Sequence, residues 1–218
     1  MRHQVKKIGL VFLLLLTFSG SAGAQEDPIK FPPLNLGPDD VGVVRGFIWG
    51  ISKDDVREFE TGMYFDELEN AIFYLDYVFR KRTLITYEFN KGKLWRVQLS
   101  SKREYSDPKA PLDDFGELQQ ELSRKYGEAE VVMDWKSRKY RDYPKYWGTA
   151  MMQGSLEMSA RWHDEKYNTD IVLYLKGRDF VPSLTLTYTD KAQEEAMKQI
   201  DSNGTILLPD PVKPEVNP

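Results

Sequence analysis

The feature that most constrains this fold is a series of short segments in which apolar and polar residues alternate. Ile85 and Tyr87, for example, alternate with Thr86 and Glu88. A period of two is typical of antiparallel strands that bury one face. The alternation predicts strands over 70–79, 83–89, 93–100, 155–163, 169–176 and 183–189, with a shorter one near 129–135.

Other segments carry the marks of helices. Ser52 and Asp55 stand three residues apart, as in a capping box, and predict that a short helix begins there. A final helix is expected over 191–200, with Asp190 as its N-cap. The helix between these two is predicted by apolar residues at spacings of three and four: Leu112, Phe115, Leu118, Leu122 and Tyr126.

The order of these elements is helix–three strands, a linker, helix–three or four strands, and a C-terminal helix. We therefore predict a single α+β domain over 47–200, built as a twisted, mainly antiparallel sheet with helices on one face. The Pro-containing linker leaves two arrangements open. The halves 47–105 and 111–200 either share one sheet or form two.

Residues 1–24 have the three parts of a secretory signal peptide. Basic residues precede an apolar run over 8–18, and small residues close the segment. The run is too short for a stable transmembrane span, so we predict an exported protein, periplasmic or secreted, without a transmembrane anchor. Prolines on either side of the domain predict an extended lead-in over 25–46 and a Pro-rich tail over 201–218.

Composition excludes several classes of function. The chain has 30 Lys and Arg against 34 Asp and Glu, and removal of the predicted signal peptide would change its net charge from −4 to −7. Such an acidic balance argues against nucleic acid as a partner. The chain has no cysteine, which excludes disulfides, thiolate metal sites and a lipid on the first mature residue. Only His163 remains as a histidine after residue 24, and we expect no metal and no cofactor.

The stretch Phe47-x-Trp49-Gly50-x-Ser52-x-x-Asp55-Val56 resembles the opening of uncharacterised bacterial exported proteins. The helix-then-hairpin order that follows it is similar to that of the small lipoprotein of the outer-membrane barrel-assembly machine. It is also similar to β-lactamase inhibitor protein, which doubles such a unit. The chain departs from both because it has neither a lipidation cysteine nor disulfides. The resemblance covers 50–60 residues of the first half and implies a non-enzymatic binding domain, with no functional residue carried over.

The segment from Lys136 to Trp147 combines cations with aromatic side chains. Such a combination suits recognition of an anionic or glycan-bearing partner, whereas the alternative is a connecting loop whose aromatic residues lie on the domain edge. Pro144 excludes a continuous helix through the segment. The candidate binding residues are Lys136, Arg138, Lys139, Tyr140, Arg141, Tyr143, Tyr146 and Trp147.

The polar face of the predicted sheet is a weaker candidate. By alternation, four polar side chains point away from the core: Arg96, Gln98, Arg161 and His163. Glu88 and Glu157 accompany them. If the two halves share one sheet, these residues line one open face, which either binds a partner or is only solvated.

The leading prediction is a non-enzymatic binding domain for a protein or an envelope component. The alternative is a hydrolase acting on envelope material, with His163 and neighbouring acids as acid–base groups. Against it, His163 is expected to be solvated at the mouth of a hairpin, and the chain has no Gly-x-Ser-x-Gly motif. A third possibility is a binder of anionic surfaces. The sequence specifies neither a particular partner nor an oligomeric state.

Overall fold

The computed structural model describes residues 42–78, 81–102 and 104–201. The predictions for the signal peptide, for residues 25–41 of the lead-in and for residues 202–218 of the tail lie outside these residues. The elements are α1 (Lys53–Phe59), β1 (Met63–Leu68), β2 (Ala71–Val78), β3 (Lys81–Asn90), β4 (Lys93–Lys102), α2 (Ala110–Tyr126), β5 (Glu130–Trp135), the 3₁₀ turn η1 (Pro144–Tyr146), α3 (Trp147–Met152), β6 (Leu156–Asp164), β7 (Thr169–Arg178), β8 (Val181–Asp190) and α4 (Lys191–Asp201).

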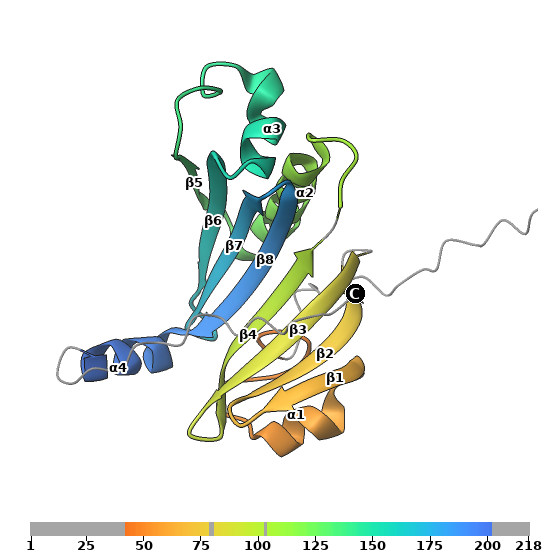
Figure 1. Cartoon of the computed structure of the whole chain (residues 1–218). Helices are drawn as coiled ribbons and strands as arrows, with labels where there is room; N and C mark the ends of the chain where they lie inside the picture. The colour runs from red at the N-terminus through yellow and green to blue at the C-terminus, as the bar shows by residue number, and fades with distance from the viewer. Residues whose placement is uncertain (1–41, 79–80, 103, 202–218) are drawn as a thin grey trace, which may run out of the picture. The chain divides into compact units, whose positions relative to one another are not determined.

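The eight strands form one open antiparallel sheet in the order β1-β2-β3-β4-β8-β7-β6-β5. The two halves of the chain are therefore joined by the pairing of β4 with β8, which lie side by side in Figure 1. Within this seam Arg96 is opposite Thr189, and Leu99 is opposite Leu186. The predicted α+β fold is confirmed, and the question left open by the linker is answered: both halves share one sheet.

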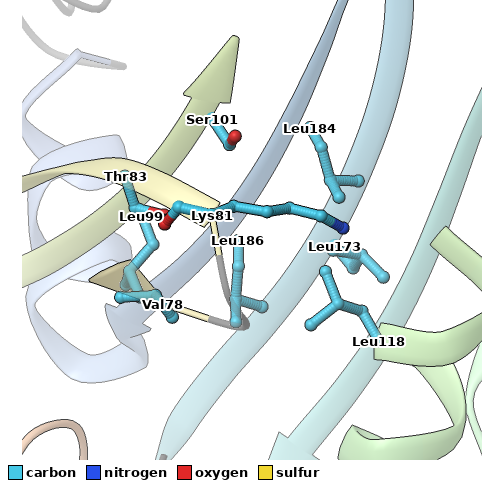
Figure 2. A pocket seen from close by; sticks show the side chains of 9 residues that line it. All are labelled: Val78, Lys81, Thr83, Leu99, Ser101, Leu118, Leu173, Leu184 and Leu186. Atoms are coloured by element: carbon cyan, nitrogen blue, oxygen red, sulfur yellow. The ribbon is translucent and has the colours of Figure 1, made fainter. Parts of the chain in front are cut away.

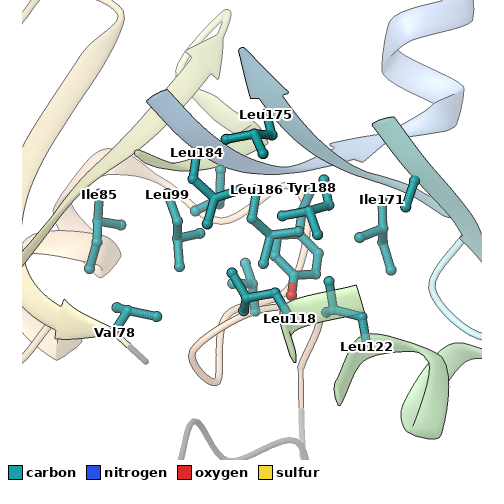
Figure 3. Close-up of a cluster of buried hydrophobic side chains, with 14 of the residues drawn as sticks. Val78, Ile85, Leu99, Leu118, Leu122, Ile171, Leu175, Leu184, Leu186 and Tyr188 are labelled. Carbon is teal, nitrogen blue, oxygen red and sulfur yellow. The ribbon is translucent and has the colours of Figure 1, made fainter. Parts of the chain in front are cut away.

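One face of the sheet carries a continuous apolar core. Val56 of α1, Leu118 of α2 and Met151 of α3 belong to the same cluster of buried side chains as Ile85 and Leu186 of the sheet. Figure 3 shows leucines of α2 beside strand residues from both halves. Three helices thus cover one face, as predicted, and α4 follows directly from β8.

The predicted helix caps are present. The hydroxyl of Ser52 accepts a hydrogen bond from the N–H of Asp55 at 3.2 Å, and the Asp55 carboxylate accepts one from the N–H of Ser52 at 2.8 Å. At α4, Oδ1 of Asp190 accepts from the N–H of Ala192 at 3.0 Å. These bonds satisfy amides that a helix leaves without an internal partner, so short sequence motifs set both helix starts.

The first half contains a strand that alternation did not predict. β1 pairs with β2, and its register shifts between Tyr64 and Asp66. This irregularity breaks the period of two, because consecutive apolar residues precede consecutive acids in the strand. The first half therefore has four strands rather than the three predicted.

β2 is apolar on both faces. Ile72 and Tyr74 belong to the core cluster, whereas Ala71 and Phe73, on the opposite face, are also buried. Alternation alone therefore did not reveal which face of β2 meets the helices. The answer depends on the pairing with β3, in which Tyr74 is opposite Ile85.

Candidate functional site

The aromatic–basic loop, residues 136–147, connects β5 to α3 and is folded by its own backbone hydrogen bonds. The N–H of Arg141 donates to the carbonyl oxygen of Arg138 at 3.2 Å, and the N–H of Tyr143 donates to that of Tyr140 at 3.0 Å. The N–H of Tyr146 then donates to Tyr143 at 2.9 Å within η1. Consecutive turns replace the continuous helix that Pro144 excludes.

The C-terminal end of the aromatic–basic loop is anchored to the core. The Trp147 ring lies edge-on to Trp135 at 5.8 Å between centroids, and its Nε1 donates to the carbonyl oxygen of Arg141 at 3.0 Å. Both Tyr140 and Trp147 pack against the core cluster. A Cβ added to Gly148 would lie 2.1 Å from the carbonyl oxygen of Pro108, so the start of α3 is pressed against the chain before α2. Trp147, predicted as a binding residue, is therefore also an anchor.

The outward side of the loop presents tyrosines and cations. Tyr143 and Tyr146 are 57% and 43% exposed. Tyr140 and Tyr146 lie 6.0 Å apart between ring centroids, with the ammonium groups of Lys139 and Lys145 at 4.9 and 4.8 Å from these two rings. This cluster combines flat apolar surface with positive charge.

Four of the five cations in the loop have no acidic partner among the residues that the structure describes. Within the part of the chain that the structure describes, no carboxylate forms an ion pair with Arg138, Lys139, Arg141 or Lys145. Lys136 differs, because its ammonium pairs with Asp134 and lies 3.7 Å from Glu157. Sequence composition identified the five cations but not which of them are neutralised.

Lys136 also connects the loop to the open face of the sheet, which is the face away from the helices. Glu157 accepts a hydrogen bond from the Tyr174 hydroxyl on the neighbouring strand β7. Burial, together with this hydrogen bond to a carboxylate, raises the pKa of Tyr174 to about 12. The loop thus begins at a corner of the open face. The sequence did not indicate Tyr174 as a site residue, because its contact with Glu157 depends on strand pairing.

The register places the four predicted face residues in two adjacent rows of the open face. Gln98 and Arg161 belong to the row that runs through Thr187 and Val172. Arg96 and His163 belong to the next row, which crosses the strands through Arg96, Thr189, Asp170 and His163. The structure therefore brings residues from both halves onto one face.

Arg96 has a constrained environment on this face. Its guanidinium lies 4.1 Å from the centroid of the Trp95 ring and 3.4 Å from the Glu88 carboxylate. Its buried Nε has no hydrogen-bond acceptor. Burial raises the pKa of Glu88, and the charge of Arg96 offsets this only in part. The Arg96–Glu88 ion pair is therefore mostly removed from solvent, and its 3.4 Å contact is long.

His163 is paired rather than free in solvent. Its Nδ1 lies 2.7 Å from Oδ1 of Asp170, directly opposite on β7, and its Nε2 lies 3.7 Å from Glu165. No hydroxyl among the described residues bonds to the imidazole, so the geometry supplies an oriented base without a nucleophile. The sequence predicted a histidine in contact with solvent only, whereas in the structure Asp170 bonds its ring. The hairpin register would have indicated this partner.

A small apolar hollow lies on the core side of the seam between the halves. Figure 2 shows the Lys81 side chain lying across leucines of β7, β8 and α2. The hollow has an empty volume of about 320 Å³, counting the part that is open to solvent. The Lys81 ammonium pairs with Asp114 at 2.7 Å, and Asp114 also accepts from the Tyr105 hydroxyl at 2.6 Å. No residue of the aromatic–basic loop lines this hollow.

Within the described ranges there is no group of three or more His, Asp or Glu residues suited to a metal ion. No helix in those ranges is both long and apolar enough to cross a membrane. Comparisons with protein-family models, curated proteins and solved structures found no match.

Proposed function

We propose that this chain is an exported, non-enzymatic binding domain whose aromatic–basic loop recognises an anionic protein or envelope component. The observation that carries the proposal is a set of four exposed cations that no carboxylate of residues 42–78, 81–102 or 104–201 neutralises, in the same loop as the exposed Tyr143 and Tyr146. The chain as a whole is acidic, so this local excess of positive charge is not explained by composition. Tyrosine and arginine dominate the energetics of many interfaces.

The anchoring of the loop supports the same proposal. Its turns, the Trp147–Trp135 contact and the close approach at Gly148 hold the backbone before any partner arrives. A preorganised loop loses less conformational entropy on binding than a flexible one. Exposed Tyr143 and Tyr146 can therefore contribute contact area at low cost.

The test compares two double variants with equal loss of charge. Arg138→Gln with Arg141→Gln removes loop cations, whereas Lys91→Gln with Arg178→Gln removes two exposed cations elsewhere. We expect capture from envelope extracts to fall at least tenfold for the first pair only, and to weaken with added salt. Equal capture by both pairs contradicts the proposal.

A second pair of variants tests the aromatic part. Tyr143→Ala with Tyr146→Ala removes exposed rings without touching the anchor Trp147. This variant should keep the melting temperature of the parent but no longer capture a component from envelope extracts. Sedimentation with vesicles containing phosphatidylglycerol distinguishes a general binder of anionic surfaces, which pellets with the vesicles, from a binder of a specific component, which does not.

The hydrolase alternative is favoured by one observation, the 2.7 Å pair between His163 and Asp170. A carboxylate that orients an imidazole is part of many general-base arrangements. His163→Ala that abolishes a hydrolytic activity without lowering the melting temperature would support this alternative. If the parent protein hydrolyses nothing in envelope extracts, the hydrolase alternative is excluded.

A further inference from the structure

The exposed large hydrophobic side chains concentrate at one edge of the sheet. Of thirteen such residues in the described part of the chain, six lie between 59 and 77. They are Phe59, Met63, Tyr64, Phe65, Leu68 and Tyr77. Four of the six belong to β1, which is one of the two terminal strands of the sheet. Clustered exposed apolar residues mark interaction surfaces more often than scattered ones do.

These residues are exposed on both faces of β1. Tyr64, 55% exposed, is opposite Tyr74 of the core face and lies edge-on to its ring at 6.0 Å. Met63, 61% exposed, and Leu68 are opposite Leu75 and Ala71, on the face away from the core cluster. A partner lying flat on either face would cover only one group. A strand added beside β1 would extend both faces and cover both groups.

The backbone of β1 permits such an addition. Among the described residues β1 pairs only with β2, so no strand lies along its other edge. Two backbone groups of β1 are bonded to side chains instead: the Leu68 carbonyl oxygen accepts from the Lys53 ammonium at 2.6 Å, and the Glu67 N–H donates to Asp66 at 2.8 Å. An exposed edge of this kind accepts extended peptides in several recognition modes. Backbone pairing supplies affinity, while neighbouring side chains supply selectivity.

Charge at this edge indicates the kind of strand that fits. Glu67 is neutralised by Arg57 and by Lys53, whose ammonium lies 3.1 Å away. Asp66 forms no ion pair with any described residue, although its Oδ1 accepts a hydrogen bond from the N–H of Glu67 at 2.8 Å. A lysine or arginine on the incoming strand would meet Asp66. A second copy of β1 would instead bring another Asp66 to the seam, where like charges repel.

We propose that β1 is a docking edge for an extended segment of a partner protein that is apolar and carries basic side chains. The segment adds to the sheet beside β1 and contacts Tyr64 on one face and Met63 and Leu68 on the other. This proposal does not depend on the aromatic–basic loop, because that loop follows β5 at the opposite end of the strand order.

The first test uses a fluorescein-labelled ten-residue peptide of valine, threonine and two lysines, titrated with the full chain and followed by fluorescence anisotropy. We expect saturable binding. An analogue N-methylated through its central residues keeps the side chains but loses the backbone donors, and should bind at least tenfold more weakly. Equal binding of both peptides, or no binding of the parent peptide, overturns the proposal.

The second test exchanges charges across the proposed contact. Asp66→Lys should weaken binding of the lysine peptide about fivefold and favour a peptide with glutamate in place of lysine. Glu128→Lys, at an exposed position beyond α2, is the matched control and should change neither affinity. Concentration-dependent dimers that Met63→Lys abolishes would identify a second copy as the occupant and overturn the proposal.

Discussion

At the scale of single residues, Glu60 is a carboxylate enclosed by hydrogen-bond partners. Its side chain is 1% exposed, and its oxygens accept hydrogen bonds from Arg45 at 2.7 and 3.1 Å, from the N–H of Gly62 at 2.7 Å and from the Tyr87 hydroxyl. Burial opposes ionisation of Glu60, but these hydrogen bonds outweigh it and hold its pKa below the ordinary value of 4.5. Arg45 also bonds Asp76 at 2.7 Å, so this one site ties the segment before α1 to β2.

We expect Glu60→Gln to lower the free energy of unfolding at pH 7 by about 2–3 kcal/mol, because it leaves Arg45 less compensated in a buried place. The stabilisation from a lowered carboxyl pKa is complete above the ordinary pKa and is lost as the pH falls through the lower folded-state value. The difference between parent and variant in urea unfolding should therefore shrink below about pH 4.5. A difference that stays constant between pH 7 and pH 3 would show that the charge of Glu60 is not responsible.

At the scale of elements, α3 is the piece that positions the aromatic–basic loop. It is short, and it is held by the burial of Ala150, Met151 and Met152 and by the close backbone approach between Gly148 and Pro108 rather than by helix length. The same chain has a second helical glycine, Gly116 of α2, where an added Cβ would meet nothing within 4 Å. Gly148 therefore permits a close backbone contact, whereas Gly116 has space for a side chain.

Gly148→Ala should lower the free energy of unfolding by about 2–3 kcal/mol, since a methyl group at 2.1 Å from a backbone oxygen forces α3 or the preceding chain to move. Gly116→Ala should raise stability by up to about 1 kcal/mol, because alanine favours a helix interior over glycine. Urea midpoints of the two variants check both signs. Equal midpoints for both variants would mean that α3 can shift without cost.

At the scale of the whole molecule, the seam between β4 and β8 joins the two halves of the chain in one sheet and one core. Leu99 and Leu186 face each other across it, and both belong to the core cluster that α2 covers. The halves share a sheet and a core, so neither has a complete hydrophobic interior alone.

Leu186→Ala should therefore destabilise both halves together, by about 2–4 kcal/mol. Tryptophan fluorescence and far-ultraviolet circular dichroism should report one coincident transition for the parent and the variant. Amide hydrogen exchange in β2 and in β7 should accelerate in parallel. Two separate transitions would show that the halves fold independently.

The sequence by itself determined most of the local structure. Alternation located seven of the eight strands, and the caps at Ser52 and Asp190 located two helix starts, because these signals depend on neighbours within a few positions. It also identified the cations and tyrosines of the loop. It missed β1, whose bulge breaks the period of two, and α3, whose six residues are stabilised by packing.

Only the tertiary structure decided how these pieces meet. Four features join residues that are distant in sequence or on different elements: the seam between β4 and β8, the Asp170 partner of His163, the approach of Lys136 to Glu157, and the enclosure of Glu60. The physical reason is that a side chain's burial and charge balance depend on which strands become neighbours. Strand order and register are set by how apolar surface is shared over the whole sheet, not by local pattern.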